Sequence, residues 1–220
     1  MLKSILKYST VLGIALVAGQ AQADMLVFKA NSGSGINDCS GNPEYSCEVL
    51  GPTDIPNPVS ANPNDDTLSV WKEVGPLTLA SDLTVNSAAG GGTIISSGTT
   101  IQSYMLQFDS PQPGAGTLEA GIEFGSEVLG LITATGLLNA TDSLLGAPGI
   151  VYETFNARGL EGNDVVDFGA DMFSVDVFFR TTSPGDWVRV ITAAEVSEPG
   201  SLALLATALV GVGLSRRKRR

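Results

Sequence analysis

The sequence predicts an all-β protein, an antiparallel β-sandwich of jelly-roll type, with an apolar segment at each end that does not belong to the sandwich. Two observations predict this fold. Short runs of β-branched and aromatic residues follow one another from Thr67 to Ala193, and several alternate apolar with polar positions. Turn signals such as Gly90-Gly91-Gly92 and Pro111–Gly114 recur about every 8 to 12 residues, which is typical of sandwiches rather than of β-α-β units.

The first 23 residues have the three parts of a secretory signal peptide. Two lysines make its beginning positive, Val11–Ala18 is apolar, and Ala21-Gln22-Ala23 supplies the small-x-small site that signal peptidase accepts. A membrane-anchored or buried first helix is the alternative, but the apolar core is short for it. We therefore expect cleavage before Asp24 and export of the mature chain.

Residues 24–195 form the expected sandwich domain, whose elements follow from the apolar runs. In Met172–Arg180, the odd positions from Phe173 to Phe179 form the apolar face, as expected of a half-buried strand. One helix is expected, at Asn139–Leu145, capped by Asn139 or Thr141 and ended by Gly146. The expected strands, in chain order, are Met25–Ala30, Tyr45–Leu50, Leu68–Val74, Leu77–Val85, Thr93–Ser96, Thr100–Phe108, Gly116–Phe124, Val128–Thr133, Val151–Phe155, Asp164–Phe168, Met172–Arg180 and Trp187–Ala193.

Residues 31–66 are dense in Gly, Pro, Asn, Asp and Ser, and predict a long irregular loop. The chain's two cysteines, Cys39 and Cys47, lie in this loop. In an exported protein such a pair is expected to form a disulfide, which would contribute ~2.6 kcal/mol by closing a loop of about nine residues. The alternative, a metal site on the two thiolates, lacks a second pair of Cys or His residues.

The charges exclude several function classes. The chain has no histidine, so no Ser-His-Asp triad, Cys-His dyad or His-ligated metal can form from it. All acidic residues except Glu198 fall within 24–195, where 22 acidic residues meet five basic ones, for a net charge of −17. Such a body repels nucleic acids and anionic membrane surfaces. Nucleic-acid binding is therefore excluded.

The densest acidic stretch is the one place where a cation site is conceivable. Calcium prefers six to eight oxygen ligands, and loops can supply them. The spacing is not that of an EF-hand, so solvated loop carboxylates are the favoured interpretation, and we expect Arg158 to pair with one of them. The candidate ligands are Glu161, Asp164, Asp167 and Asp171. No other cofactor is expected.

Two catalytic patterns are weaker still. Ser69-Val70-Trp71-Lys72 fits the S-x-x-K pattern of Ser/Lys acyl transfer, but that pattern opens a helix and this one lies in a strand-like run. Glu119, Glu123 and Glu127 share a face if the run stays extended, and a glycosidase needs two facing carboxyl groups in a cleft. Acids on one face of a strand are more simply the solvated face of a sheet. We therefore expect no enzyme.

The C-terminal segment has three parts. Ser197-Glu198-Pro199 precedes an apolar stretch, Ser201–Leu214, and the chain ends in five cationic residues, Arg216, Arg217, Lys218, Arg219 and Arg220. A helix over the apolar stretch spans ~21 Å at ~1.5 Å per residue, against a hydrocarbon core of ~30 Å. The cationic end should remain cytoplasmic, which leaves the body outside, in agreement with the signal peptide. A buried core helix with a basic tail is the alternative.

This segment, Val196–Arg220, closely resembles the PEP-CTERM sorting signal of Gram-negative bacteria: a Glu-Pro element, a short apolar helix and an Arg-rich end. Ser197 departs from the usual Pro-Glu-Pro, so only Glu198 and Pro199 match. The resemblance implies transient residence in the inner membrane, processing near Glu198 by an exosortase, and final placement at the cell surface or outside. It also implies a bacterium that makes exopolysaccharide or biofilm.

The body resembles, more weakly, an uncharacterised group of exported domains found ahead of such tails. The resemblance lies between Thr93 and Thr192 and rests on Gln102–Asp109, Ile122-Glu123-Phe124, Val128–Ile132, Arg158–Glu161 and Val188–Thr192. It implies a sandwich domain and carries no known catalytic residues.

Three functions remain open. The favoured one is a non-enzymatic component of the cell envelope or extracellular matrix, in contact with signal peptidase, exosortase and exopolysaccharide. The second is a carbohydrate-binding or calcium-dependent adhesive module with an exposed aromatic platform drawn from Trp71, Trp187, Tyr104 or Tyr152. The third is a carboxylate-based hydrolase, which needs a deep cleft with two facing carboxyl groups. Buried aromatic residues would leave the first.

The signal-peptide interpretation predicts the mature N-terminus. Because Ala21 and Ala23 supply the small residues that signal peptidase requires, N-terminal sequencing of the exported protein should begin at Asp24. Replacing Ala23 with Phe should leave the precursor uncleaved, whereas the same change at Gln22, which lies between the two small positions, should not. Exported protein that begins at Met1 would contradict the interpretation.

Overall fold

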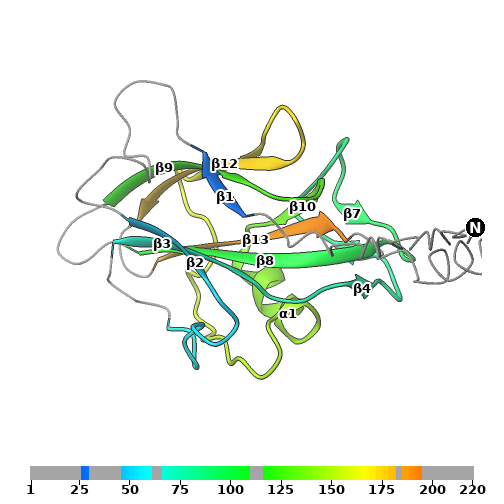
Figure 1. The fold of residues 1–220 in the computed structure, drawn as a ribbon, viewed down its shortest axis with the longest axis horizontal. Coiled ribbons are helices and arrows are strands. Elements are labelled where there is room, and N and C mark those ends of the chain that lie inside the picture. The colour runs from blue at the N-terminus through cyan, green and yellow to red at the C-terminus, as the bar shows by residue number, and fades with distance from the viewer. Residues whose placement is uncertain (1–25, 30–45, 61–65, 110–115, 182–184, 195–220) are drawn as a thin grey trace, which may run out of the picture.

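The computed structural model describes residues 26–29, 46–60, 66–109, 116–181 and 185–194, and these residues form two packed β-sheets with one helix (Figure 1). The all-β sandwich predicted from the sequence is confirmed. Sheet A is antiparallel throughout. Its strands, in spatial order, are β1 (Val27–Lys29), β9 (Gly116–Glu123), β12 (Ser174–Thr181) and β11 (Val165–Phe168).

Sheet B has seven strands, of which only β2 and β3 pair in parallel. The strands along the sheet are β2 (Ser46–Leu50), β3 (Thr67–Lys72), β8 (Thr100–Phe108), β13 (Asp186–Ala193), β10 (Val128–Ile132) and β6 (Ser87–Ala88). A seventh strand, β4 (Leu77–Thr78), also pairs with β8. A separate ribbon joins β5 (Leu83–Thr84) to β7 (Ile94–Ile95).

Sheet B is covered on both faces. Its face toward sheet A contributes residues such as Leu106, Val188 and Val190 to one apolar cluster, the inter-sheet core, together with Ile122 and Val177 of sheet A. Its opposite face packs against the helix α1 (Thr135–Leu145) and the loops around it (Figure 1). We call that second cluster the helix-side core. Double burial explains why eight of the nine residues of β8 are buried, whereas the edge strand β2 is mostly exposed.

Most of the expected strands are present, and three expectations need correction. The run Leu77–Val85 contains only β4 and β5, with turns between them, so Leu79 and Val85 reach the helix-side core from loops. Val151–Phe155 is no strand: Tyr152 makes a single bridge to Val59. The alternation expected from Met172 begins two residues later, because Met172 has a φ of 60°, and Phe173 is 44% exposed rather than buried.

The helix α1 is longer than the sequence predicted. It begins at Thr135, four residues before Asn139, and its N-cap Ala134 makes no side-chain cap bond. Asn139 and Thr141 therefore lie inside the helix rather than at its start. The predicted end is correct: Gly146 follows the last turn, and a Cβ there would lie 2.5 Å from the carbonyl oxygen of Asp142, so only glycine fits.

Several predicted features lie outside the described residues. They are the signal peptide, most of the loop 31–66 including Cys39, and the C-terminal segment. Cys47 lies on β2 and is not a free thiol, but its pairing with Cys39 stays a prediction. Within the described ranges, no helix has both the length and the apolar character to cross a membrane.

Candidate functional site

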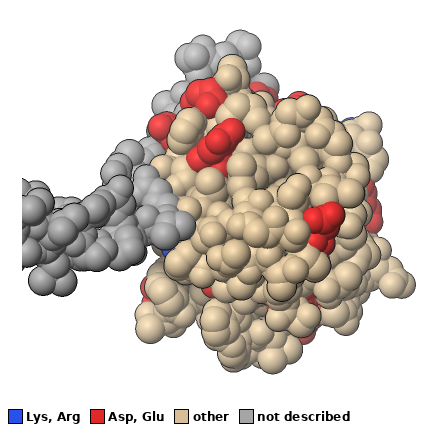
Figure 2. Space-filling model, turned by 90° about the vertical axis from the view of Figure 1, so that its right-hand side faces the viewer, with Lys and Arg blue, Asp and Glu red and all other residues tan. Residues whose placement is uncertain are grey.

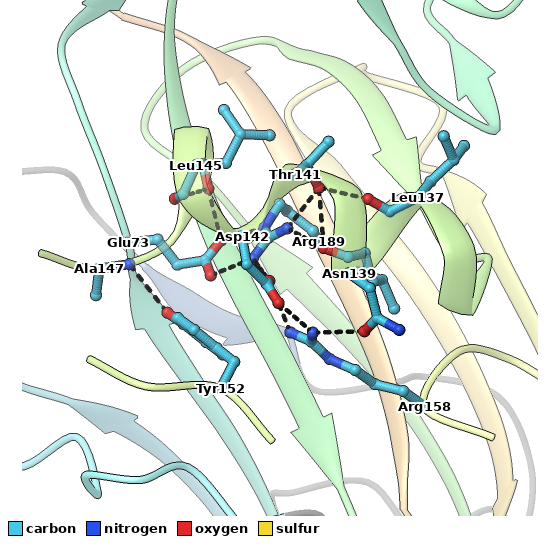
Figure 3. Close-up of polar contacts among 12 residues, drawn as sticks. Glu73, Leu137, Asn139, Thr141, Asp142, Leu145, Ala147, Tyr152, Arg158 and Arg189 are labelled. Atoms are coloured by element: carbon cyan, nitrogen blue, oxygen red, sulfur yellow. Dashed lines mark hydrogen bonds and ion pairs between the residues drawn. The ribbon is translucent and has the colours of Figure 1, made fainter. Parts of the chain in front are cut away.

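The most elaborate polar site in the described residues is a cluster of two arginines and two carboxylates beneath α1, which we call the arginine cluster: Glu73, Asp142, Arg158 and Arg189 (Figure 3). Arg189 lies on β13, Glu73 follows β3, Asp142 lies on α1, and Arg158 lies on the loop before β11. Each arrives from a different segment, so only the folded chain assembles the cluster.

Arg189 and Glu73 form its centre. The Nε of Arg189 lies 2.6 Å from Oε2 of Glu73, and Nη2 lies 2.7 Å from Oε1, a bidentate pair in which both side chains are fully buried. The remaining donor, Nη1, contacts the Thr141 hydroxyl at 2.7 Å. Ser103 Oγ donates to Glu73 Oε2 at 2.6 Å. The buried charges are therefore compensated by both a counter-ion and hydrogen bonds.

Asp142 connects the two arginines. Its Oδ1 accepts from Arg189 Nη2 at 2.9 Å and from Arg158 Nη2 at 3.0 Å, and its Oδ2 lies 2.5 Å from Arg158 Nη1. The Arg158 guanidinium also stacks 4.3 Å from the centroid of the Trp187 ring. Arg158 was expected to pair with the acidic stretch around Asp164. Its partner is Asp142, because the loop carries its side chain under α1.

Electrostatics fix the protonation states in the cluster. Burial by itself lowers the pKa of the Arg189 guanidinium, but the carboxylates of Glu73 and Asp142 outweigh it and hold that pKa above its ordinary value. Burial, and next the charge of Glu73, raise the pKa of Tyr152 far above 10. Tyr152 therefore stays neutral, and its hydroxyl accepts from the Ala147 amide at 3.0 Å. The cluster joins α1 and its flanking loop to sheet B as a charge-balanced unit.

Ser69 and Lys72, the ends of the S-x-x-K pattern, bond to different partners. Ser69 donates to Oε1 of Glu48 at 2.8 Å, and the Lys72 ammonium donates to the Gln102 side chain. The strand β3 places them three positions apart, so they face opposite sides of the sheet. Each of the two side chains therefore has its own hydrogen-bond partner.

The carboxylates considered for a hydrolytic dyad lie on β9 and just beyond it. Glu119 and Glu123 share the outer face of sheet A, as the alternation predicted, and Glu127 lies past the end of the strand, exposed. This is the solvated face of a sheet rather than a deep cleft.

The calcium prediction finds no support in the geometry. Among the described residues, no three His, Cys, Asp or Glu side chains are arranged to hold a metal ion. Asp164 uses its carboxylate to accept from the amides of Arg180 and Glu161, at 2.7 and 2.9 Å. Asp171 accepts from the Phe173 amide and the Ser174 hydroxyl. Asp167 projects from the exposed side of β11. Asp164 and Asp171 therefore bond to separate groups of the chain, and the described candidate ligands do not converge on one point.

The aromatic residues considered for a stacking platform are core residues. Trp71 and Trp187 are fully buried, and Tyr104 and Tyr152 are at least nine-tenths buried. Tyr104 packs in the inter-sheet core and the other three in the helix-side core. An exposed platform built from these four is therefore ruled out.

A recess lies on the outer face of sheet A, and we call it the sheet-A recess. Its volume is about 270 Å³, and its lining residues are Glu119, Val165, Asp167, Asp176, Val177 and Phe178. The strand registers order them: Val165, Phe178 and Glu119 lie side by side in one row across β11, β12 and β9. The next row holds Asp167, Asp176 and Gly121, followed by Lys29 on β1.

The surface is sparse in cations. Of the five basic residues in the body, Arg158 and Arg189 are inside the protein. The face in Figure 2 accordingly shows separated patches of Asp and Glu and almost no Lys or Arg. On this face the negative charge is dispersed rather than gathered into one patch.

Comparison with known proteins gives a match at the C-terminal end of the chain. The model described as the PEP-CTERM protein-sorting motif matches residues 195–220. The chain carries a PEP-CTERM sorting motif. This motif implies that the protein is exported, that its precursor is held at the membrane, and that an exosortase processes it. No curated protein and no solved structure matches the chain.

Sequence reasoning missed the arginine cluster. Arg189 interrupts the apolar run Trp187–Ile191, and Glu73 follows directly on β3. A lone charge within an apolar strand run of this kind indicates a buried ion pair. The partner cannot be named without the topology, because Glu73 and Arg189 are 116 positions apart.

The buried pair should make Glu73 essential for stability. Glu73→Gln keeps the shape but leaves the Arg189 guanidinium with a neutral amide, so the free energy of unfolding should fall by about 3 kcal/mol. Chemical denaturation of the exported protein measures it. The control, Glu127→Gln, removes an exposed carboxylate and should change stability by less than about 0.5 kcal/mol. Equal effects of the two changes would refute the assignment.

Proposed function

We propose that this protein is a non-enzymatic component of the cell envelope or extracellular matrix, delivered by an exosortase in a bacterium that makes exopolysaccharide or biofilm. The observation that carries the proposal is the sorting motif at residues 195–220. The motif is contiguous and has three parts, so chance similarity is a poor explanation of it. The body then acts where the motif delivers it, at the cell surface or outside.

The physical properties of the tail suit temporary residence in a membrane. The apolar stretch Ser201–Leu214 is shorter, as a helix, than a typical hydrocarbon core, so it is a weak permanent anchor. The cationic residues at 216–220 resist translocation and hold the chain in the inner membrane with the body outside. A second protein has time to act on it there.

The Glu-Pro element provides the place for that action. Pro199 has no amide hydrogen and disfavours helix at Glu198, so the membrane helix begins after Glu198. Ser197-Glu198-Pro199 then remains extended at the outer boundary of the membrane, accessible to an exosortase. Processing there would separate the body from its anchor.

The body supports a structural rather than a chemical role. The aromatic residues are in the two cores, and the arginines of the helix-side core are paired with carboxylates. The body presents an acidic β-sandwich to solvent. An acidic surface keeps an exported protein soluble and separate in a hydrated polymer matrix.

The processing step can be tested directly. Glu198→Ala combined with Pro199→Ala should leave export intact but abolish trimming of the C-terminus, because both matched positions of the motif are removed. Cell fractionation with an epitope in the body, followed by mass analysis of the C-terminus, gives the result. Ser197→Ala, at the position that already departs from the usual motif, is the control and should be trimmed normally. If the double variant were trimmed like the wild type, the segment would be a plain anchor and the exosortase assignment would fail.

A second candidate function, a carbohydrate-binding or adhesive module, is favoured by the sheet-A recess. Asp167 and Asp176 lie directly opposite one another on β11 and β12, an arrangement of like charges that costs stability. A ligand whose hydroxyl or ammonium groups donate to both carboxylates would offset that cost. Phe178, half-buried in the adjacent row, offers an apolar surface for a sugar ring. The recess has room for about one ring.

Binding by the exported protein to a glycan array that includes the producing bacterium's exopolysaccharide would test this second candidate. Phe178→Ala and Asp176→Asn should each weaken binding about tenfold, since each removes one contact of about 1.4 kcal/mol. Glu127→Gln, outside the recess, should bind as the wild type does. Absence of binding, or equal loss in all three variants, would remove this candidate and leave the first.

A further inference from the structure

Asp186 lies where the fold calls for an apolar residue. It is the first residue of β13, and the alternation of that strand places it on the same side as Val188 and Val190, which face sheet A in the inter-sheet core. The carboxyl group is 4% exposed. Its Oδ2 has no hydrogen-bond partner within the part of the chain that the structure describes.

The elements around Asp186 add further negative charge. Asp109, fully buried, follows β8, and Glu161 and Asp164 come from the loop before β11. That loop adjoins β13 directly, since the Trp187 amide donates to the Arg158 carbonyl at 3.0 Å. Of the cations nearby along the chain, the Arg158 guanidinium pairs with Asp142, and Arg180 is exposed on β12. The negative charges of Asp164, Glu161 and Asp109 all act on the Asp186 carboxyl group.

The backbone next to Asp186 is tightly packed. Gly185, just before it, is pressed against the end of β8, where a Cβ would lie 2.4 Å from the Phe108 carbonyl oxygen. Phe108 itself is fully buried and stacks with Phe179, 6.2 Å between ring centroids, in the inter-sheet core. An ionised carboxylate in this position would be a buried charge without compensation, which costs several kcal/mol.

We propose that Asp186 is a proton-operated latch: as a neutral carboxyl group it closes this end of the inter-sheet core, and on losing its proton it releases the start of β13 from the loop at Arg158–Asp164. Burial, and next the charges of Asp164, Glu161 and Asp109, raise the pKa of Asp186 to about 8. The closed state therefore keeps its proton at neutral pH, and opening becomes more frequent as the pH rises toward 8. It lies at the opposite end of β13 from the sorting segment, so it stands apart from the proposed function.

The sign of the pH dependence follows from linkage. An unfolded or opened chain releases this proton near pH 4, whereas the closed state keeps it to about pH 8. The closed state therefore binds more protons between those values, and its stability falls as pH rises through that window. The equilibrium constant for opening should increase up to about tenfold per pH unit and level off above pH 8.

Hydrogen exchange of the Trp187 amide in the exported protein, between pH 6 and 9, tests the latch. We compare the wild type with Asp186→Asn, which has the same shape and no titration, so the intrinsic pH dependence of exchange cancels. The wild-type opening constant should rise up to about 100-fold relative to Asp186→Asn between pH 6 and 8. Glu127→Gln, which removes an exposed carboxylate just beyond β9, should follow the wild type. Equal pH profiles for wild type and Asp186→Asn would overturn the proposal.

A second measurement does not depend on the variant folding. The carboxyl ¹³C signal of Asp186 in the wild-type protein should titrate with a midpoint near pH 8, and a midpoint below pH 5 would overturn the proposal. Adding calcium provides the last test. If millimolar calcium at pH 7 slows exchange of the Trp187 amide in the wild type but not in Asp186→Asn, the carboxyl groups hold a cation rather than a proton, and the latch is refuted.

Discussion

The bidentate pair between Arg189 and Glu73 is the centre of the contacts that join sheet B to α1 and its flanking loop. A sandwich of two sheets does not by itself account for this helix-side half of the molecule. Sheet B is covered on both faces, so each polar side chain that points toward α1 must find its partner inside the protein. Arg189 meets that requirement by binding Glu73 within the sheet and Asp142 on the helix. Through Asp142 the constraint extends to Arg158 and the loop beside β13. One strand residue thus positions a helix and a loop.

The same pairing sets which charges remain at the surface. Arg158 and Arg189 are enclosed together with Glu73 and Asp142, so two positive and two negative charges are balanced inside and the net charge of the exterior is unchanged. Asp186 is kept neutral by burial, so it does not add to the negative charge of the body at neutral pH. The 22 acidic residues and five cations of residues 24–195 give the body a net negative charge, which favours solubility and repels nucleic acids and anionic membrane surfaces.

Sequence reasoning succeeded where the determinant is local. The nine residues of β8 carry their own β signal, and the predicted bounds are those observed. It failed where tertiary contacts decide. Asn139 is a good N-cap residue, yet it lies inside α1, where its side chain accepts from Arg158 at 3.0 Å. In the sequence, Trp71 and Trp187 are equally compatible with a binding platform and with a core. Only the structure shows that both lie in the core between sheet B and α1 with its loops. Neither the ion pairs nor the depth of Asp186 can be obtained from spacing, because each depends on chain segments that are distant in sequence.

This difference explains why the tail indicates a function and the body does not. A sorting signal must be recognised in an extended or membrane-bound segment, so its information is contiguous and is visible in the sequence at residues 195–220. A sandwich stores its information in contacts between distant strands, and many sequences satisfy the same pattern of burial. The body is therefore free to vary so long as its two cores and the pairing of Arg189 are kept. One feature that the two cores do not require is the pair Asp167 and Asp176, whose like charges face each other across β11 and β12 at a cost in stability.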